Sequence, residues 1–458
     1  MRRSGVVGAM VAVLLLVSAP ALGQSGDVYQ PGFHQALRWS ETTPAVTTYR
    51  LRIPISRSGH RVRVAFRAGD GSLTISSANI AKAGANGALA STPQTLSFSG
   101  GTGFTAAARQ RVVSDPLPFD VSKGDELFVS FEADGALSTS SILALPGSRS
   151  WPGHHAADLA APNGSDWYRA IGVATIDVEG PQERAFVAIG DSITEGYVSG
   201  DVWDYQARHD DYRNAWPFVA SVAGLTFANA GVSGQGVDGA LVNADDEIFV
   251  LEGITDCVLL IGTNDLASNT TTQLTAALAS LESRLSPFCK VWGGTLLPKE
   301  KTSAGDLQTV ITRRHEVNAW IRSHPWSGGV LELEPVLANG SNIDQFGPGL
   351  GEDGIHPSVS GQKKLGDFVA ATFRTTTTTS PPDAGVEPQD AGTEQVTVPD
   401  ASTPTPPSTT NSNDPPTTKS SGVTPDASPQ PASCATVSQL SPVLAALLVA
   451  LARRRRSQ

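Results

Sequence analysis

From residue 184 onward, short apolar segments alternate with longer segments in which apolar residues recur every three or four positions. The apolar segments span 184–190, 256–262, 290–297 and 330–333, and the periodic ones include 272–285 and 307–322. The first pattern is typical of buried strands and the second of amphipathic helices. Alternating strands and helices predict an α/β domain, a parallel sheet covered by helices on both faces. Ligands of such sheets bind at the carboxyl ends of the strands.

Residues 27–180 have a different pattern. Short segments alternate apolar and polar residues, and Gly, Asp and Asn clusters such as 69–71 separate them. These segments are 61–66, 72–75, 94–98 and 126–131. Regularly spaced short strands with polar turns predict an all-β sandwich of the jelly-roll kind.

The N-terminus has the features of an export signal. Arg2 and Arg3 precede an apolar run at 6–17, and small residues at 21–23 offer a cleavage site. The run is too short to cross a bilayer as a helix. We therefore expect residues 1–24 to be a signal peptide, and the mature protein to be secreted or attached to the cell surface.

The C-terminal part is rich in Thr, Pro, Asp and Ser. Residues 375–433 cannot bury enough apolar surface to fold, so we expect an extended, disordered stalk. Residues 434–458 begin with Cys434 and contain an apolar stretch, 443–452, followed by four arginines, 453–456. This tail resembles the C-terminal sorting tags of myxobacterial surface proteins, which implies a membrane or cell-surface tether. A weak tail anchor and a disordered end are the alternatives.

Charge and cysteine content limit the classes of function. A formal net charge of −11 argues against nucleic acid as a partner, because binding the phosphate backbone requires a dense basic surface. Cys257 and Cys289 each precede a short apolar run, and those runs are expected to be neighbouring strands. A disulfide between them and two buried free thiols both fit that arrangement.

Two motifs carry groups suited to nucleophilic catalysis. Ser192 follows Gly190 and Asp191 at the carboxyl end of an expected strand, where a turn would present its hydroxyl above the sheet edge. Asp353 stands three positions before His356 in a Gly-containing loop. A serine hydroxyl requires an adjacent base, and that base requires a carboxylate to fix its tautomer. An ordinary turn, a helix-capping Asp353 and a solvent-exposed His356 are the structural alternatives.

Two further segments supply hydrogen-bond donors. Gly234 ends a Gly-rich run, 229–234, and could present an unobstructed backbone N–H, while Asn264 follows the next expected strand with a side-chain amide. Donors that converge on one point form an oxyanion hole for acyl transfer. The order of the glycines does not fit a dinucleotide-binding loop.

Taken together, these blocks resemble the SGNH (GDSL-type) hydrolase family over residues 184–374. The resemblance implies a flavodoxin-like three-layer α/β/α domain at 183–374 that needs no metal or organic cofactor. It implies Ser192 as nucleophile, His356 as general base and Asp353 as its orienting carboxylate. The backbone N–H groups of Ser192 and Gly234 and the amide of Asn264 would bind the oxyanion. Asp344 also precedes the Asp353 loop and is the alternative orienting acid.

The β-rich region, 25–182, resembles the β-sandwich that precedes the catalytic domain in some secreted bacterial GDSL esterases. We therefore expect a secreted serine esterase that removes acetyl or short acyl groups from a polysaccharide or a small ester. A lipase or thioesterase, and a non-catalytic surface protein that binds carbohydrate, are the alternatives. Tyr197, Trp203 and Tyr205 follow the nucleophile and could line an acyl or sugar pocket, although packing is the expected role.

Overall fold

The computed structural model describes residues 26–160, 164–198 and 211–375. The expected signal peptide and sorting tag lie outside the described residues, as do Trp203, Tyr205 and the expected stalk except its first residue, Thr375. The β-rich region and the α/β domain both belong to one compact unit of the chain. The described helices do not include one that is both long enough and apolar enough to span a bilayer.

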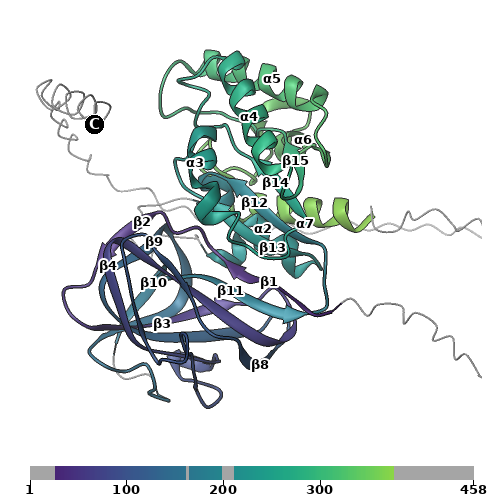
Figure 1. The fold of residues 1–458 in the computed structure, drawn as a ribbon. Coiled ribbons are helices and arrows are strands. Elements are labelled where there is room, and N and C mark those ends of the chain that lie inside the picture. Colours follow the sequence, from purple (N-terminus) through teal and green to yellow (C-terminus); the bar gives the residue numbers. More distant parts are fainter. Residues whose placement is uncertain (1–25, 161–163, 199–210, 376–458) are drawn as a thin grey trace, which may run out of the picture. The chain divides into compact units, whose positions relative to one another are not determined.

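The N-terminal region consists almost entirely of strands (Figure 1). They are β1 (Val28–His34), β2 (Trp39–Thr42), β3 (Thr47–Pro54), β4 (Gly59–Lys82), β5 (Gln94–Thr95), β6 (Phe104–Ala106), β7 (Arg111–Val113), β8 (Leu117–Val121), β9 (Glu126–Pro152), β10 (Ser165–Ile171) and β11 (Val173–Gly180), with one 3₁₀ turn, η1 (Ala85–Gly87).

Two long strands, β4 and β9, organise this region. The first half of β4 pairs with β7, β8 and β11, and β11 pairs with β1. The second half of β4 pairs with β9, which also pairs with β2, β3 and β10. Buried side chains from both sets of strands, among them Phe66, Leu51 and Phe131, form one core. The predicted β-rich region is therefore confirmed.

One detail of the strand prediction was wrong. Residues 61–66 and 72–75 were expected to be separate strands with a turn at 69–71, but they lie in the single strand β4. The pairing of β4 with β9 shifts register between Ala68 and Leu73. Glycine inside a strand often marks such a bulge, because it tolerates the local bend without ending the pairing.

The second region alternates strands and helices. Its elements are β12 (Ala185–Gly190), α1 (Ser192–Glu195), η2 (Tyr212–Asn214), α2 (Trp216–Val222), β13 (Thr226–Gly231), α3 (Val237–Glu247), β14 (Asp256–Leu260), α4 (Thr271–Leu285), β15 (Lys290–Gly294), α5 (Leu307–Ser323), β16 (Gly329–Leu331), α6 (Glu334–Leu337), β17 (Ala338–Asn339), β18 (Asn342–Phe346) and α7 (Val359–Thr375).

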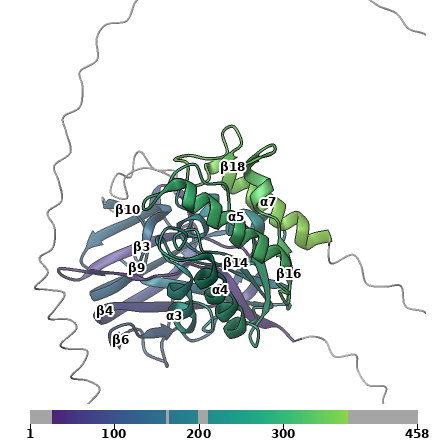
Figure 2. The same cartoon turned by 90° about the horizontal axis from the view of Figure 1, so that it is seen from above.

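The main sheet of this region is parallel and covered on both faces. Its strand order is β13-β12-β14-β15-β16, and every neighbouring pair is parallel. Helices α3, α4 and α5 bury side chains such as Leu278 and Val317 in one core cluster. Helices α2 and α7 bury Trp216 and Phe373 in a second cluster. Figures 1 and 2 show the helices that surround the strands of this region. The predicted α/β content is confirmed, and the strands begin and end close to the expected positions.

Polar contacts connect the β-rich region to the α/β domain. The backbone N–H of Ala36, just after β1, donates to the carbonyl oxygen of Asn229 in β13 at 3.1 Å. The hydroxyl of Tyr212 donates to the carbonyl oxygen of His34 at 3.0 Å. At the end of α3, the buried carboxylate of Glu247 pairs with the buried guanidinium of Arg67 from β4. The two regions therefore share a hydrogen-bonded, partly ionic interface.

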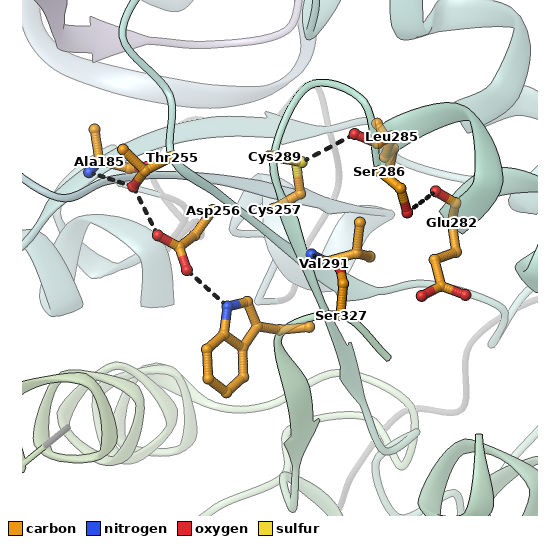
Figure 3. Close-up of a disulfide and its surroundings, with 11 residues drawn as sticks. Ala185, Thr255, Asp256, Cys257, Glu282, Leu285, Ser286, Cys289, Val291 and Ser327 are labelled. Carbon is orange, nitrogen blue, oxygen red and sulfur yellow. Dashed lines mark hydrogen bonds between the residues drawn. A yellow bond between two sulfur atoms is a disulfide. The ribbon is translucent and has the colours of Figure 1, made fainter. Parts of the chain in front are cut away.

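The two cysteines of the α/β domain are paired, which settles whether they are free thiols or a disulfide. Cys257 and Cys289 form a disulfide, with Cα atoms 5.8 Å apart (Figure 3). Cys257 lies near the amino end of β14, and Cys289 immediately precedes the neighbouring strand β15. The disulfide therefore ties together two central strands at the sheet edge opposite their carboxyl ends.

Candidate active site

Ser192 lies where the central strand β12 passes into the short helix α1. Strand β12 ends at Gly190, and the carboxylate of Asp191 caps α1 by accepting the backbone N–H of Ile193 at 3.0 Å. A Cβ at position 190 would lie 2.1 Å from Oγ1 of Thr194 and 2.6 Å from the carbonyl oxygen of Leu260. Only glycine permits this close approach. The turn therefore holds Ser192 at the carboxyl edge of the sheet.

The side chains of Ser192, His356 and Asp353 form a continuous hydrogen-bonded chain. Oγ of Ser192 lies 2.9 Å from Nε2 of His356, and Nδ1 of His356 lies 2.8 Å from Oδ2 of Asp353. The other carboxylate oxygen of Asp353 accepts the backbone N–H groups of Ile355 and His356, at 2.9 and 2.8 Å. The carboxylate therefore fixes both the imidazole and the loop that carries it.

Electrostatics favour an ionised Asp353. Partial burial alone would raise the pKa of its carboxyl, but the hydrogen bonds from His356 and Ile355 and the charge of His356 outweigh this and lower the pKa to about 2. Asp344, the alternative orienting acid, is engaged elsewhere. Its Oδ1 accepts from the buried guanidinium of Arg314 at 2.5 Å and lies 2.6 Å from Nε2 of His315.

The three expected oxyanion donors line one cavity together with the hydroxyl of Ser192. Gly234 has a φ of 76° and lies in a turn closed by the N–H of Gln235, which donates to the carbonyl oxygen of Val232 at 3.1 Å. Within the described part of the chain, the backbone N–H groups of Ser192 and Gly234 have no acceptor. The amide of Asn264 donates one hydrogen to the carbonyl oxygen of Gln235 at 3.0 Å, which leaves its second hydrogen for a ligand.

Asn229 also holds this edge of the sheet together. Its side-chain amide donates to the carbonyl oxygen of Thr194 at 2.8 Å, and its Oδ1 accepts the N–H of Gly231 at 2.9 Å. These bonds tie the end of β13 to the helix that begins with Ser192. Asn229 is buried and does not line the cavity.

The cavity has a volume of about 520 Å³ and lies between the two regions of the chain. Its α/β-domain lining includes the residues named above. The β-rich region supplies Trp39, Ser40, Thr139, Ser140, Ser141, Ile142 and Arg169. Sequence reasoning placed the site in the α/β domain alone and missed this second wall, because no local pattern indicates which strand of one region faces the other.

Three residues at or behind the cavity wall were missed or given another role in the sequence analysis. The ring of Tyr197, expected to be a packing residue, lines the cavity with its centroid 4.4 Å from that of His356. The buried amine of Lys299 lines it as well and donates to Oγ1 of Thr263 at 3.3 Å. Burial lowers the pKa of this amine, and the charges of Asp191 and Asp353 oppose that effect. The third residue, Glu195, lies behind the cavity wall and is fully buried.

A hydroxyl beside an imidazole that is hydrogen-bonded to a carboxylate, together with nearby N–H donors, is the arrangement that acyl transfer requires. The described residues include no group of three or more His, Cys, Asp or Glu side chains placed to hold a metal ion.

The sequence model of the GDSL-like Lipase/Acylhydrolase family matches residues 188–364. The search of curated proteins gave no match. Similar solved structures include a member of the lipolytic protein G-D-S-L family from Veillonella parvula, at 20% identity and a TM-score of 0.34, covering 42% of this chain and 99% of that one. Est24, a carbohydrate acetylesterase from Sinorhizobium meliloti, is 16% identical with a TM-score of 0.35, covering 42% and 100%. The lipase/acylhydrolase from Enterococcus faecalis is 21% identical with a TM-score of 0.32, covering 42% and 97%. Residues 188–364 are therefore a domain of the GDSL/SGNH lipase and acylhydrolase family.

Proposed function

We propose that this chain is a serine esterase that hydrolyses carboxylic esters through an acyl-serine intermediate. The observation that supports the proposal most strongly is the hydrogen-bonded chain from Ser192 through His356 to Asp353, at the wall of a cavity that Gly234 and Asn264 also line. Oγ of Ser192 bonds to the ester carbonyl carbon while Nε2 of His356 takes the hydroxyl proton. His356 then returns that proton to the departing alcohol as the carbon–oxygen bond breaks. Water repeats the attack, and the carboxylic acid leaves.

The tetrahedral intermediates carry a negative charge on the former carbonyl oxygen. The backbone N–H groups of Ser192 and Gly234 and the free amide hydrogen of Asn264 would donate to it. Donors of this kind lower the barrier because they are already in place before charge develops, and one of them is worth about 10²- to 10³-fold in kcat.

We propose acetyl or short acyl esters on a polysaccharide as the substrate class. Trp39 supports this assignment, because 56% of its surface is exposed although it lines the cavity that contains Ser192. An exposed aromatic face beside a catalytic hydroxyl suits stacking against a sugar ring. Long-chain esters or thioesters are the alternative substrates, and chain-length profiling separates them.

We also propose the fold type of the two domains and the location of the protein. The strand order of the main sheet supports a flavodoxin-like domain at 183–374, after a jelly-roll-like domain at 25–182. Export and a cell-surface tether rest on the sequence of residues 1–24 and 434–458.

The experiment measures hydrolysis of p-nitrophenyl acetate and longer p-nitrophenyl esters by the full chain and by its Ser192→Ala variant. We expect release of p-nitrophenol by the parent chain, fastest for the short acyl groups, and loss of at least about 10³-fold in the variant. Equal rates in the two proteins, or no hydrolysis by the parent, would contradict the assignment.

A further inference from the structure

Glu195 is a buried acid that the proposed reaction does not use. It ends helix α1, which begins with Ser192, and only 1% of its surface is exposed. A buried carboxylate is costly unless hydrogen bonds compensate for its lost hydration. Among the described residues, three donors bond to the carboxylate of Glu195, and they come from two different regions of the chain.

One side of the carboxylate faces the β-rich region. Oε1 of Glu195 accepts the backbone N–H of Ser141 at 3.0 Å, and Oε2 accepts the hydroxyl of Ser141 at 2.6 Å. Ser141 belongs to β9 and lines the cavity. This pair of bonds fixes β9 to the helix that carries the nucleophile.

The other side faces the loop that carries an oxyanion donor. Oε2 of Glu195 also accepts the backbone N–H of Ser233 at 2.6 Å. Ser233 directly precedes Gly234, and both lie inside the turn from Val232 to Gln235. Holding the N–H of Ser233 fixes the orientation of this turn, and with it the direction of the next N–H, that of Gly234.

We propose that Glu195 is a positioning residue through which β9 of the β-rich region holds the Gly234 N–H in the oxyanion hole. This inference rests on the proposed function. It makes the β-rich region a structural part of the active site, in contrast to an accessory domain joined only by a linker. Burial raises the pKa of Glu195, and the bonds from Ser141 and Ser233 oppose this effect. The two backbone N–H groups and the hydroxyl of Ser141 all donate to the carboxyl of Glu195, which suits an ionised carboxylate because it can only accept.

The test uses the full chain and p-nitrophenyl acetate, which is too small to depend on a glycan-binding surface. Glu195→Gln keeps the size of the side chain but replaces one acceptor oxygen with an NH₂ group, which cannot accept an N–H. Ser141→Ala removes one of the two bonds to β9, and Ser141→Thr restores a hydroxyl. We expect Glu195→Gln to lower kcat about 10- to 100-fold with KM nearly unchanged, because the displaced donor acts on the transition state. Ser141→Ala should lower kcat less, and Ser141→Thr should recover part of the loss.

Two matched variants report purely structural effects. Ser148→Ala removes another buried hydroxyl from β9, one that donates to the carbonyl oxygen of Leu145. Tyr212→Phe removes a hydrogen bond between the two regions away from the cavity. Both should keep the kcat of the parent chain when assayed well below their Tm.

A second readout is the rate at which a p-nitrophenyl phosphonate modifies Ser192. Oγ bonds to phosphorus, p-nitrophenolate leaves, and the phosphoryl oxygen occupies the oxyanion hole. Slower modification of Glu195→Gln, with the same final stoichiometry as the parent, supports the proposal. A fall in Tm with unchanged kcat and modification rate would overturn it. Loss of activity in Ser192→Ala alongside an unaffected Glu195→Gln would leave the esterase assignment standing while rejecting this inference.

Discussion

Asp353 and His356 are joined twice: Oδ2 of the carboxylate lies 2.8 Å from the ring Nδ1, and Oδ1 accepts the backbone N–H of His356 at 2.8 Å. The first bond sets the tautomer of the imidazole, so that Nε2 faces Ser192 as an acceptor. The second bond closes a tight loop that leaves the ring little freedom to turn away. Two residues only three positions apart therefore set both the tautomer of the imidazole and the direction in which its Nε2 points.

Replacement of Asp353 by Asn tests this double connection. The Asn oxygen can still accept the backbone N–H groups, but its NH₂ would donate to Nδ1 of His356. That reverses the tautomer, so Nε2 carries the proton and cannot accept one from Ser192. We expect kcat to fall about 10³- to 10⁴-fold. Steady-state hydrolysis of p-nitrophenyl acetate provides the measurement.

Asp344→Asn is the matched control for that variant, because Asp344 pairs with Arg314 and His315. It should lower the Tm while keeping kcat within about 3-fold of the parent. A loss of kcat comparable to that of Asp353→Asn would instead identify Asp344 as the orienting acid.

The buried carboxyl of Asp191 should make stability depend on pH. Burial is the main cause that raises its pKa to about 6, from an ordinary value of 3.8. The native state therefore retains the proton more tightly than the unfolded chain. The resulting stabilisation is complete below pH 3.8 and is lost as the pH rises through 6. Asp191→Asn keeps a side-chain oxygen for the cap of α1 but does not titrate.

We therefore expect the free energy of unfolding of the parent chain to fall by about 2 kcal/mol relative to Asp191→Asn between pH 4 and pH 7. Urea denaturation of both proteins at several pH values measures the difference. A gap that stays constant over this range would show that Asp191 does not change its protonation on unfolding.

Trp39 should affect large substrates and leave small ones unchanged. Its exposed ring can cover about 50 Å² of a sugar, which corresponds to roughly 10-fold in affinity. We expect Trp39→Ala to raise KM for an acetylated oligosaccharide about 10-fold, with little change for p-nitrophenyl acetate. Val242→Ala, which shortens another exposed apolar side chain that does not line the cavity, should change neither value. Equal effects of Trp39→Ala on both substrates would count against a sugar-stacking role.

The Cys257–Cys289 disulfide should contribute to stability without supporting the chemistry. It closes a loop with a sequence separation of 32 and lies at the amino ends of its strands, away from Ser192. Replacement of both cysteines by Ala should lower the free energy of unfolding by about 3–4 kcal/mol and leave kcat unchanged. Denaturation with and without a reductant measures the effect. A reductant should destabilise the parent chain and have no effect on the double variant.

Part of this architecture could be predicted because its causes are local. The apolar segments at 256–262 and 290–297 contain the buried strands β14 and β15, since they have few polar groups to solvate. The segments at 272–285 and 307–322 have the helical spacing of apolar residues, and they form the helices that cover the sheet. The prediction of two strands in place of β4 was wrong because the glycines at 69–71 permit either a turn or a bulge. Only the pairing of β4 with β9 decides between the two.

The sequence by itself determined which groups could act, since Ser192, Asp353 and His356 stand in short motifs of residue types suited to nucleophilic catalysis. Only the tertiary structure decided that these side chains lie within hydrogen-bonding distance of one another. Ser192 and His356 are separated by 164 positions, and they come within 2.9 Å because the loop between β18 and α7 meets the turn that follows β12. The second wall of the cavity, with Ser141 hydrogen-bonded to Glu195, likewise depends on how the β-rich region packs on the α/β domain. Packing between distant segments depends on the complementarity of whole surfaces, so it cannot be predicted from short sequence motifs.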